Sequence, residues 1–237
     1  MVDGYFVHFV APENLPPMPK HVVFVLDTSG SMEGKKMLQT QSAMKTILSE
    51  LRDGSDYMTI VSFSDEIRTW EWDGNVVAPV STASKLAAID HVENLQAEGD
   101  VQNLVHPLFL SPSECGSLLS GNTNINEALL EALSVVADAV ALRKEAQPLV
   151  FFLTDGHPTV GETDSGAILE NVKRANGECE AAIFSLAFGR LADFQMLKLL
   201  SLQNNAFARK IYVAADASLQ LEGFYKEVSS VLVRWIG

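Results

Sequence analysis

The stretch His21-Val-Val-Phe-Val-Leu-Asp-Thr-Ser-Gly-Ser31 decides the fold of this chain. Its first six residues form a short, continuous apolar run, rich in β-branched and aromatic side chains, between Pro19 and Asp27. Such a run predicts a strand that is buried on both faces, as strands in parallel sheets are. The polar residues that follow it then mark the carboxyl end of that strand.

Strand and helix patterns alternate along the rest of the chain. Apolar strands are expected at 57–63, 149–153, 181–188 and 206–212, and Ile67–Trp72 alternates in the manner of an exposed edge strand. Apolar residues recur at helical spacing in 36–51, 84–96, 126–143, 167–175, 194–202 and 219–235. The pattern predicts an α/β fold: a doubly wound, mostly parallel sheet with one antiparallel edge strand and helices on both faces, in the Rossmann-like manner.

Composition limits the function classes. The chain has 237 residues, 47% of them hydrophobic, with 17 Lys and Arg against 30 Asp and Glu, a formal net charge of −13. The apolar content excludes a disordered chain, and no apolar run reaches the roughly 18 residues of a membrane span. The acidic balance argues against nucleic acid as a partner and is compatible with cation binding.

We expect one domain at 20–237, preceded by a lead-in segment at 1–19. The lead-in combines a strand-like string, expected as an edge strand, with a Pro-rich connector, Asn14-Leu-Pro-Pro-Met-Pro19. The first residues lack the basic and apolar regions of a signal peptide, and the beginning resembles a piece excised from a longer chain. Cys115 and Cys179 lack metal-ligand spacing, and the sequence leaves open whether they are free or bridged.

Oxygen-bearing side chains follow the predicted strands at one edge of the sheet, where doubly wound folds bind ligands. They are Asp27, Ser29 and Ser31 after the first strand, Thr123 at the start of the 126–143 helix, and Asp155 after the 149–153 strand. Two carboxylates and three hydroxyls, with neither His nor Cys, suit a hard cation, and Mg²⁺ is the expected ion, with Mn²⁺ and Ca²⁺ as the other candidates. We call these five residues the oxygen cluster.

Each member of the oxygen cluster also has an ordinary structural interpretation. Asp27 and Ser29 could cap the helix that begins near Lys35, and Thr123 could cap the next one. Thr154-Asp155-Gly156 could be a plain turn, since Asp-Gly is a turn dipeptide. The occurrence of all three in this order, each after the right kind of element, favours a shared site.

The motif Asp27-x-Ser29-x-Ser31 with Thr123 and Asp155 resembles the metal-ion-dependent adhesion site (MIDAS) of von Willebrand factor type A domains, and the element order matches that fold over 20–235. Five further segments are similar to inter-alpha-trypsin inhibitor heavy chains: 3–9, 11–14, 122–126, 154–162 and 219–228. The segment Gly99–Gly121 is longer than the corresponding link in that family. It could shape or cover the metal site, or be a tolerated surface insertion.

The resemblance implies roles for the cluster. Ser29 and Ser31 would bind the metal directly, Thr123 directly or through water, and Asp27 and Asp155 mostly through water. A remaining position would take an acidic group of a protein or matrix partner. It also implies a secreted, extracellular protein in a hyaluronan-associated complex.

Two other function classes are the alternatives to a binding module. An enzyme is not expected. Val25-Leu-Asp-Thr-Ser-Gly30 is similar to the hydrophobic-Asp-Thr-Gly turn of aspartic proteases, but Ser29 interrupts that pattern and the sequence has no second copy of it. The G-x-S-x-G turn of serine hydrolases is also missing from the sequence, and a metal-dependent hydrolase is a minor alternative. The main alternative is an intracellular type A scaffold subunit of a protein assembly.

Overall fold

The computed structural model describes residues 18–98, 122–142, 145–189, 192–213 and 216–230. The predicted lead-in strand and most of its connector, the Gly99–Gly121 insertion, Cys115 and the end of the last predicted helix lie outside the described residues.

One sheet forms the centre of the molecule. Its strands are β1 (Lys20–Asp27), β2 (Tyr57–Phe63), β3 (Ile67–Thr69), β4 (Ala78–Pro79), β5 (Gln147–Thr154), β6 (Ala182–Phe188) and β7 (Ala208–Ile211). They lie in the order β3-β2-β1-β5-β6-β7, and β4 also pairs with β2. Strands β1, β2, β5, β6 and β7 are parallel, while the short β3 and β4 pair antiparallel with β2 at its edge of the sheet. The predicted mixed sheet is confirmed.

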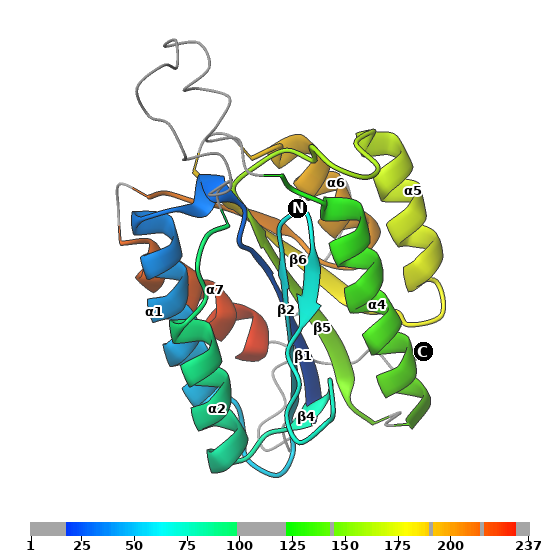
Figure 1. Cartoon of the computed structure of the whole chain (residues 1–237). Helices are drawn as coiled ribbons and strands as arrows, with labels where there is room; N and C mark the ends of the chain where they lie inside the picture. The colour runs from blue at the N-terminus through cyan, green and yellow to red at the C-terminus, as the bar shows by residue number, and fades with distance from the viewer. Residues whose placement is uncertain (1–17, 99–121, 143–144, 190–191, 214–215, 231–237) are drawn as a thin grey trace, which may run out of the picture.

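Helices cover both faces of this sheet (Figure 1). On one face lie α1 (Lys35–Glu50), α2 (Thr82–Glu93) and α7 (Ala217–Ser230). The other face carries α4 (Ile125–Leu142), α5 (Ser165–Asn176) and α6 (Phe194–Gln203). A single 3₁₀ turn, η1 (Gly30–Met32), connects β1 to α1.

The core consists of two apolar layers separated by the sheet. Because successive side chains of a strand point to opposite faces, Phe24 and Leu26 of β1 join the α1 and α7 layer, and Val23 and Val25 join the α4 layer. This explains the uninterrupted apolar run at 22–26: a central strand needs apolar side chains on both faces.

The order in which strands are added to the sheet reverses between β1 and β5. From β1 the chain runs outward to β2 on one side, and later through β5, β6 and β7 on the other. β1 and β5 pair in parallel from Lys20–Gln147 to Leu26–Leu153, so their carboxyl ends lie next to each other. Ligands of doubly wound sheets bind at such a switch point, and this is where Asp27 and Asp155 lie.

The predicted boundary of α2 was wrong. The helix begins two residues earlier than expected, because Ser81 and Ser84 form a reciprocal capping box, and it ends at Glu93 rather than Gln96. Of the apolar stripe Leu86, Ile89, Val92 and Leu95 that the spacing predicts, Val92 is buried and Ile89 and Leu95 pack against the core, but Leu86 is 64% exposed. Ser84 and Ala88 are buried in addition. Most other predicted boundaries were right within about two residues, among them Tyr57–Phe63 for β2.

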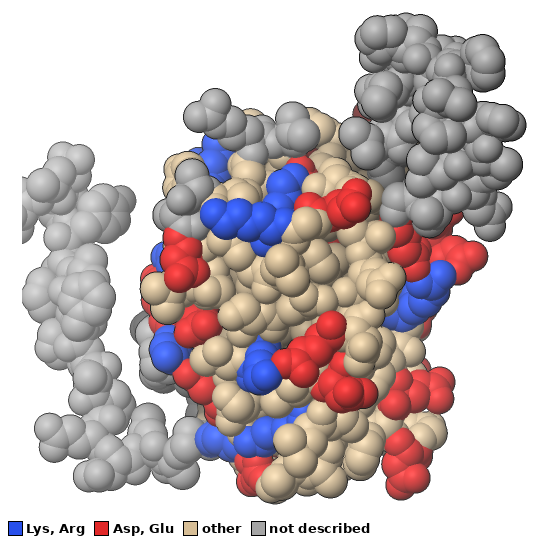
Figure 2. Space-filling model, turned by 60° about the vertical axis from the view of Figure 1, so that its left-hand side comes forward, with Lys and Arg blue, Asp and Glu red and all other residues tan. Residues whose placement is uncertain are grey.

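Charged side chains of both signs are interspersed over the face that carries α1 (Figure 2). Ion pairs connect α1 to α2 through Lys45 and Glu93, and α7 to α1 through Lys226 and Glu50. No helix in the described ranges is both long and apolar enough to cross a membrane.

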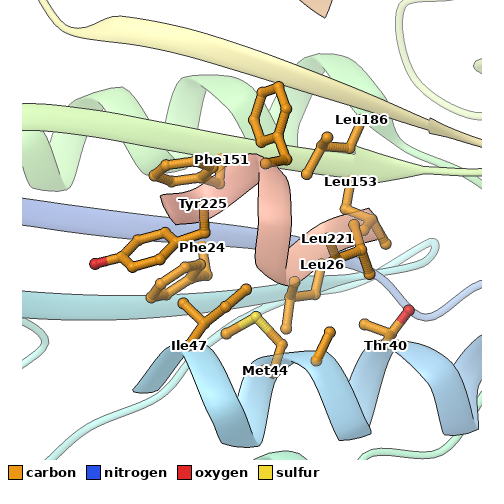
Figure 3. Close-up of a pocket in the computed structure, with 12 residues that line it drawn as sticks. Phe24, Leu26, Thr40, Met44, Ile47, Phe151, Leu153, Leu186, Leu221 and Tyr225 are labelled. Atoms are coloured by element: carbon orange, nitrogen blue, oxygen red, sulfur yellow. The ribbon is translucent and has the colours of Figure 1, made fainter. Parts of the chain in front are cut away.

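A small cavity of about 20 Å³ remains between the sheet, α1 and α7 (Figure 3). Aromatic and aliphatic side chains form almost all of its wall, among them Phe24, Met44, Phe151 and Leu221. The exception is Thr40 of α1, whose buried hydroxyl has no hydrogen-bond partner within the described part of the chain. A cavity of this size has room for about one water molecule.

Candidate metal site

Asp27 ends β1 and is completely buried. Its Oδ1 accepts a hydrogen bond of 2.8 Å from the backbone N–H of Ser29, and its Oδ2 accepts one of 2.5 Å from the Thr154 hydroxyl at the end of β5. The first bond shapes the turn after β1, and the second joins the ends of the two strands. The sequence indicated only that Thr154 belongs to a turn, and it did not predict the hydrogen bond from Thr154 to Asp27.

A chain of short contacts runs from the β1 turn to Asp155. The hydroxyl oxygens of Ser29 and Ser31 lie 3.1 Å apart, and the Ser31 hydroxyl donates to Asp155 Oδ1 at 2.5 Å. Ser29 and Asp155 are fully buried, while Ser31 is half-buried. Four of the five predicted residues therefore meet at the carboxyl ends of β1 and β5.

Thr123 completes the cluster from the loop before α4. A Cβ placed on Gly156 would lie 3.6 Å from Thr123 Oγ1, so this hydroxyl faces the turn that contains Asp155. The backbone of Thr123 is held by Thr159: the Thr123 N–H donates to the Thr159 hydroxyl at 2.8 Å, and the Thr159 N–H donates to the Thr123 carbonyl at 3.0 Å.

The simple capping interpretations of these residues were wrong. The residue before α1 is Gly34, which gives no side-chain cap, so neither Asp27 nor Ser29 caps that helix. At the start of α4 the Asn124 side chain accepts a hydrogen bond from the Glu127 N–H at 3.4 Å, and Asn124 thus takes the capping position expected of Thr123. Asp27 and Ser29 instead take part in the contacts between the β1 turn and the end of β5.

Sequence reasoning missed Lys36. This residue lies in the first turn of α1, and its ammonium donates to the Ser31 carbonyl at 2.9 Å and forms an ion pair with Asp155 Oδ2. No spacing rule pointed to it, because Lys36 and Asp155 are 119 positions apart and meet only in the folded chain.

Burial makes the charge of Asp27 expensive. Loss of solvation raises the pKa of Asp27 from 3.8 to about 6, the nearby Asp155 adds to the rise, and the hydrogen bonds from Ser29 and Thr154 reduce it. Two carboxylates close together in a buried site therefore call for a positive charge beside them.

The donor set fits a hard cation. All five side chains offer oxygen, the kind of ligand that Mg²⁺ prefers, and they come from three loops that the sheet holds in place. Nowhere in the described ranges do three or more His, Cys, Asp or Glu side chains gather closely enough to hold a metal. An ion in the oxygen cluster would therefore depend on the hydroxyls of Ser29, Ser31 and Thr123 as well as on the two carboxylates.

Two models of one known domain family match this chain. Models of the von Willebrand factor type A domain match residues 22–157 and 113–227. The chain belongs to the von Willebrand factor type A domain family. The first of these matches ends just beyond Asp155 and so includes all five residues of the oxygen cluster.

This type A domain is similar to inter-alpha-trypsin inhibitor heavy chains. It is 41% identical over 236 residues to heavy chain H6 of Homo sapiens and 40% identical over 238 residues to heavy chain H2 of Homo sapiens. Each match covers 98% of this chain, but only 16% of H6 and 22% of H2. The chain thus corresponds to a small part of the length of these relatives.

Solved structures share the fold at low sequence identity. A von Willebrand factor type A protein from Catenulispora acidiphila has a TM-score of 0.67 at 19% identity, with 90% of this chain and 42% of that chain covered. Proximal thread matrix protein 1 from the mussel byssus, solved with a zinc-occupied MIDAS motif, has a TM-score of 0.60 at 12% identity, with 90% and 47% covered. At these identities the likeness shows the fold alone.

Proposed function

We propose that this type A domain is a divalent-metal-dependent binding module. One ion, Mg²⁺ with Mn²⁺ or Ca²⁺ as alternatives, is held by Asp27, Ser29, Ser31, Thr123 and Asp155 and takes a carboxylate of a protein or matrix partner as a further ligand. The observation that carries the proposal is the meeting of these oxygen side chains around two buried carboxylates at the β1–β5 switch point. The mussel-byssus protein with the same fold was solved with a zinc-occupied MIDAS motif, so this fold is able to hold a divalent ion at such a motif.

The residues divide the work of holding the ion. Ser29 and Ser31 present neutral hydroxyls, which bind a cation without neutralising it, and the Thr123 hydroxyl faces the turn after β5 from the α4 side. Asp27 and Asp155 supply the negative charge, and Thr154 together with the Ser29 N–H fixes the orientation of Asp27. The bound ion supplies the positive charge that attracts an anionic group. Because the role is one of binding, no catalytic step is assigned to these residues.

The cellular setting is part of the proposal. Similarity to inter-alpha-trypsin inhibitor heavy chains supports a secreted, extracellular protein whose partners belong to a hyaluronan-associated complex. The alternative, an intracellular scaffold subunit with the same domain, predicts the opposite distribution. Detection of the full-length protein in extracellular fluid or in cytosol decides between them.

Calorimetric titration of Mg²⁺ and Mn²⁺ into the 237-residue chain tests metal binding. Asp27→Ala should abolish binding, because it removes a carboxylate at the centre of the cluster. Asp53→Ala is the matched control, since Asp53 is exposed and pairs with Lys85 away from the cluster. Absence of binding by the wild type, or equal binding by the wild type and Asp27→Ala, would refute the metal site.

The carboxylate part of the proposal has its own test, with acetate as the probe. Added to the Mg²⁺-loaded chain, acetate should shift the amide resonances of Ser29, Ser31 and Gly156, and an excess of EDTA should remove the effect. Shifts that persist in EDTA would show that acetate binds elsewhere, and no shifts at saturating Mg²⁺ would show that the ion takes no carboxylate.

A further inference from the structure

Lys36 places a positive charge inside the oxygen cluster. Its ammonium donates one hydrogen bond to the Ser31 carbonyl at 2.9 Å, on the β1 side of the cluster, and another to the Asp155 carboxylate, on the β5 side. The Lys36 side chain is 22% exposed, and that of Asp155 is fully buried. The contact therefore closes over a carboxylate that has no access to water.

The path of the Lys36 side chain fixes where the ammonium lies. Lys36 begins in the first turn of α1, and a Cβ placed on Gly189, directly after β6, would lie 4.0 Å from Lys36 Cε. The side chain thus runs from α1 across the end of β6 towards the end of β5. Lys35, the preceding residue, is exposed, and its charge acts on Asp216 instead.

The two oxygens of Asp155 have different partners. Oδ1 accepts the Ser31 hydroxyl and Oδ2 accepts Lys36. An ion bound among the hydroxyls would approach Asp155 from the Oδ1 side, with the Lys36 ammonium a few atoms away on the other oxygen. Two cations that share one carboxylate in a buried site repel each other, and the low effective dielectric strengthens this repulsion.

We propose that Lys36 is the built-in counter-cation of Asp155 and that a divalent ion binds the oxygen cluster in competition with it. Without metal, the ammonium neutralises Asp155 and holds the β1 turn to the end of β5. When the metal binds, the Lys36–Asp155 pair is weakened or exchanged, so metal affinity is lower than the oxygen donors alone would give. The proposal rests on the proposed metal site and adds a residue that sets its affinity.

The test is a calorimetric titration of Mg²⁺ alone into the 237-residue chain and its Lys36→Met variant. Lys36→Met keeps an apolar stem of similar length but removes the charge, so it should bind Mg²⁺ about tenfold more tightly than the wild type. Lys35→Met is the matched control: it changes the net charge equally on the adjacent residue and should stay within twofold of the wild type. Lys36→Arg, which keeps the charge, should also remain within about threefold.

A second measurement reports the metal-free state directly. In EDTA, Lys36→Met should melt at a lower temperature than Lys35→Met, because Asp155 loses its partner, and saturating Mg²⁺ should remove most of that difference. If Lys36→Met does not fold without metal, Lys36→Gln, which keeps a hydrogen-bond donor but no charge, is titrated in the same way.

The outcomes are distinct. Tighter Mg²⁺ binding by the neutral Lys36 variants, with Lys35→Met unchanged, supports the competition. Equal or weaker Mg²⁺ binding by the neutral Lys36 variants overturns the competition, since Lys36 would then support Asp155 in the metal-bound state. Equally tightened Mg²⁺ binding by Lys35→Met also overturns it, because the change in net charge would then explain the effect. Absence of Mg²⁺ binding by every protein overturns the proposed function and the competition together, whereas binding that Asp27→Ala abolishes but Lys36→Met leaves unchanged overturns only the competition.

Discussion

The Ser31 hydroxyl donates to Asp155 Oδ1 at 2.5 Å, across 124 positions of sequence. This single bond joins the turn after β1 to the turn after β5, the two loops on either side of the switch point. It orients a hydroxyl and a carboxylate towards the same space.

Ser31→Ala should weaken Mg²⁺ binding by about tenfold, roughly 1.4 kcal/mol, because it removes one hydroxyl ligand and releases Asp155 Oδ1. The measurement is calorimetric titration, with Ser42→Ala on the exposed side of α1 as the control. Unchanged affinity in Ser31→Ala would mean that Ser31 contributes structure but no metal contact.

Asp27→Asn should stabilise the metal-free domain at neutral pH while abolishing Mg²⁺ binding. The buried Asp27 carboxylate is held ionised against its loss of solvation, and an amide of the same shape removes that charge. We expect a gain of about 1–3 kcal/mol in the free energy of unfolding, measured by urea denaturation in EDTA. The amide also replaces one of the two accepting oxygens by a donor NH2, so a variant less stable than the wild type would show that losing the acceptor of the Thr154 hydroxyl outweighs losing the charge.

The pH dependence of the metal-free domain follows from the same group. The pKa of Asp27 is about 6 in the folded state against 3.8 for the unfolded reference, so the folded state holds this proton more tightly. The Asp27 contribution to stability is therefore present at pH 4, is lost as pH rises to about 6, and is constant above that. Measured in EDTA, the wild type should lose roughly 2 kcal/mol relative to Asp27→Asn between pH 4 and pH 7. A difference that does not vary with pH would contradict the raised pKa.

Gly161→Ala should disturb the loop that holds Thr123. Gly161 has φ +70°, and a Cβ there would lie 2.7 Å from Asn124 Oδ1, at the start of α4. We expect a loss of about 2 kcal/mol in stability together with weaker Mg²⁺ binding. Gly74→Ala separates the two causes: Gly74 also has φ +70° but nothing lies within 4 Å, so it should lose only about 1 kcal/mol and bind Mg²⁺ normally.

Thr40→Val should stabilise the domain without affecting the metal. The Thr40 hydroxyl is buried against the apolar cavity and has no partner within the described ranges, and a methyl group of the same shape removes this unsatisfied group (Figure 3). We expect a gain of about 1 kcal/mol by denaturant unfolding and an unchanged Mg²⁺ affinity. A loss of stability would indicate that a buried water serves as the partner of the Thr40 hydroxyl.

Much of the fold could be predicted from local patterns, because buried parallel strands are short and apolar on both faces. Tyr57–Phe63 was predicted with its true bounds for this reason. In α2 the predicted stripe was right at Ile89 and Val92 but wrong at Leu86, which has the same helical spacing and is exposed. The start of α2 could not be predicted from apolar spacing either, because the capping box of Ser81 and Ser84 sets it.

The amino-acid sequence by itself determined the buried strands β1 and β5 and the oxygen-bearing residues that follow them. Both are visible in consecutive residues, because each apolar run leads directly to polar ones: Asp27, Ser29 and Ser31 after β1, and Asp155 after β5. Only the tertiary structure decided what those residues touch. Thr154 meets Asp27, and Lys36 meets Asp155, across 127 and 119 positions. Such contacts depend on β1 and β5 lying side by side and on the direction in which α1 leaves the β1 turn, and no local pattern carries that information.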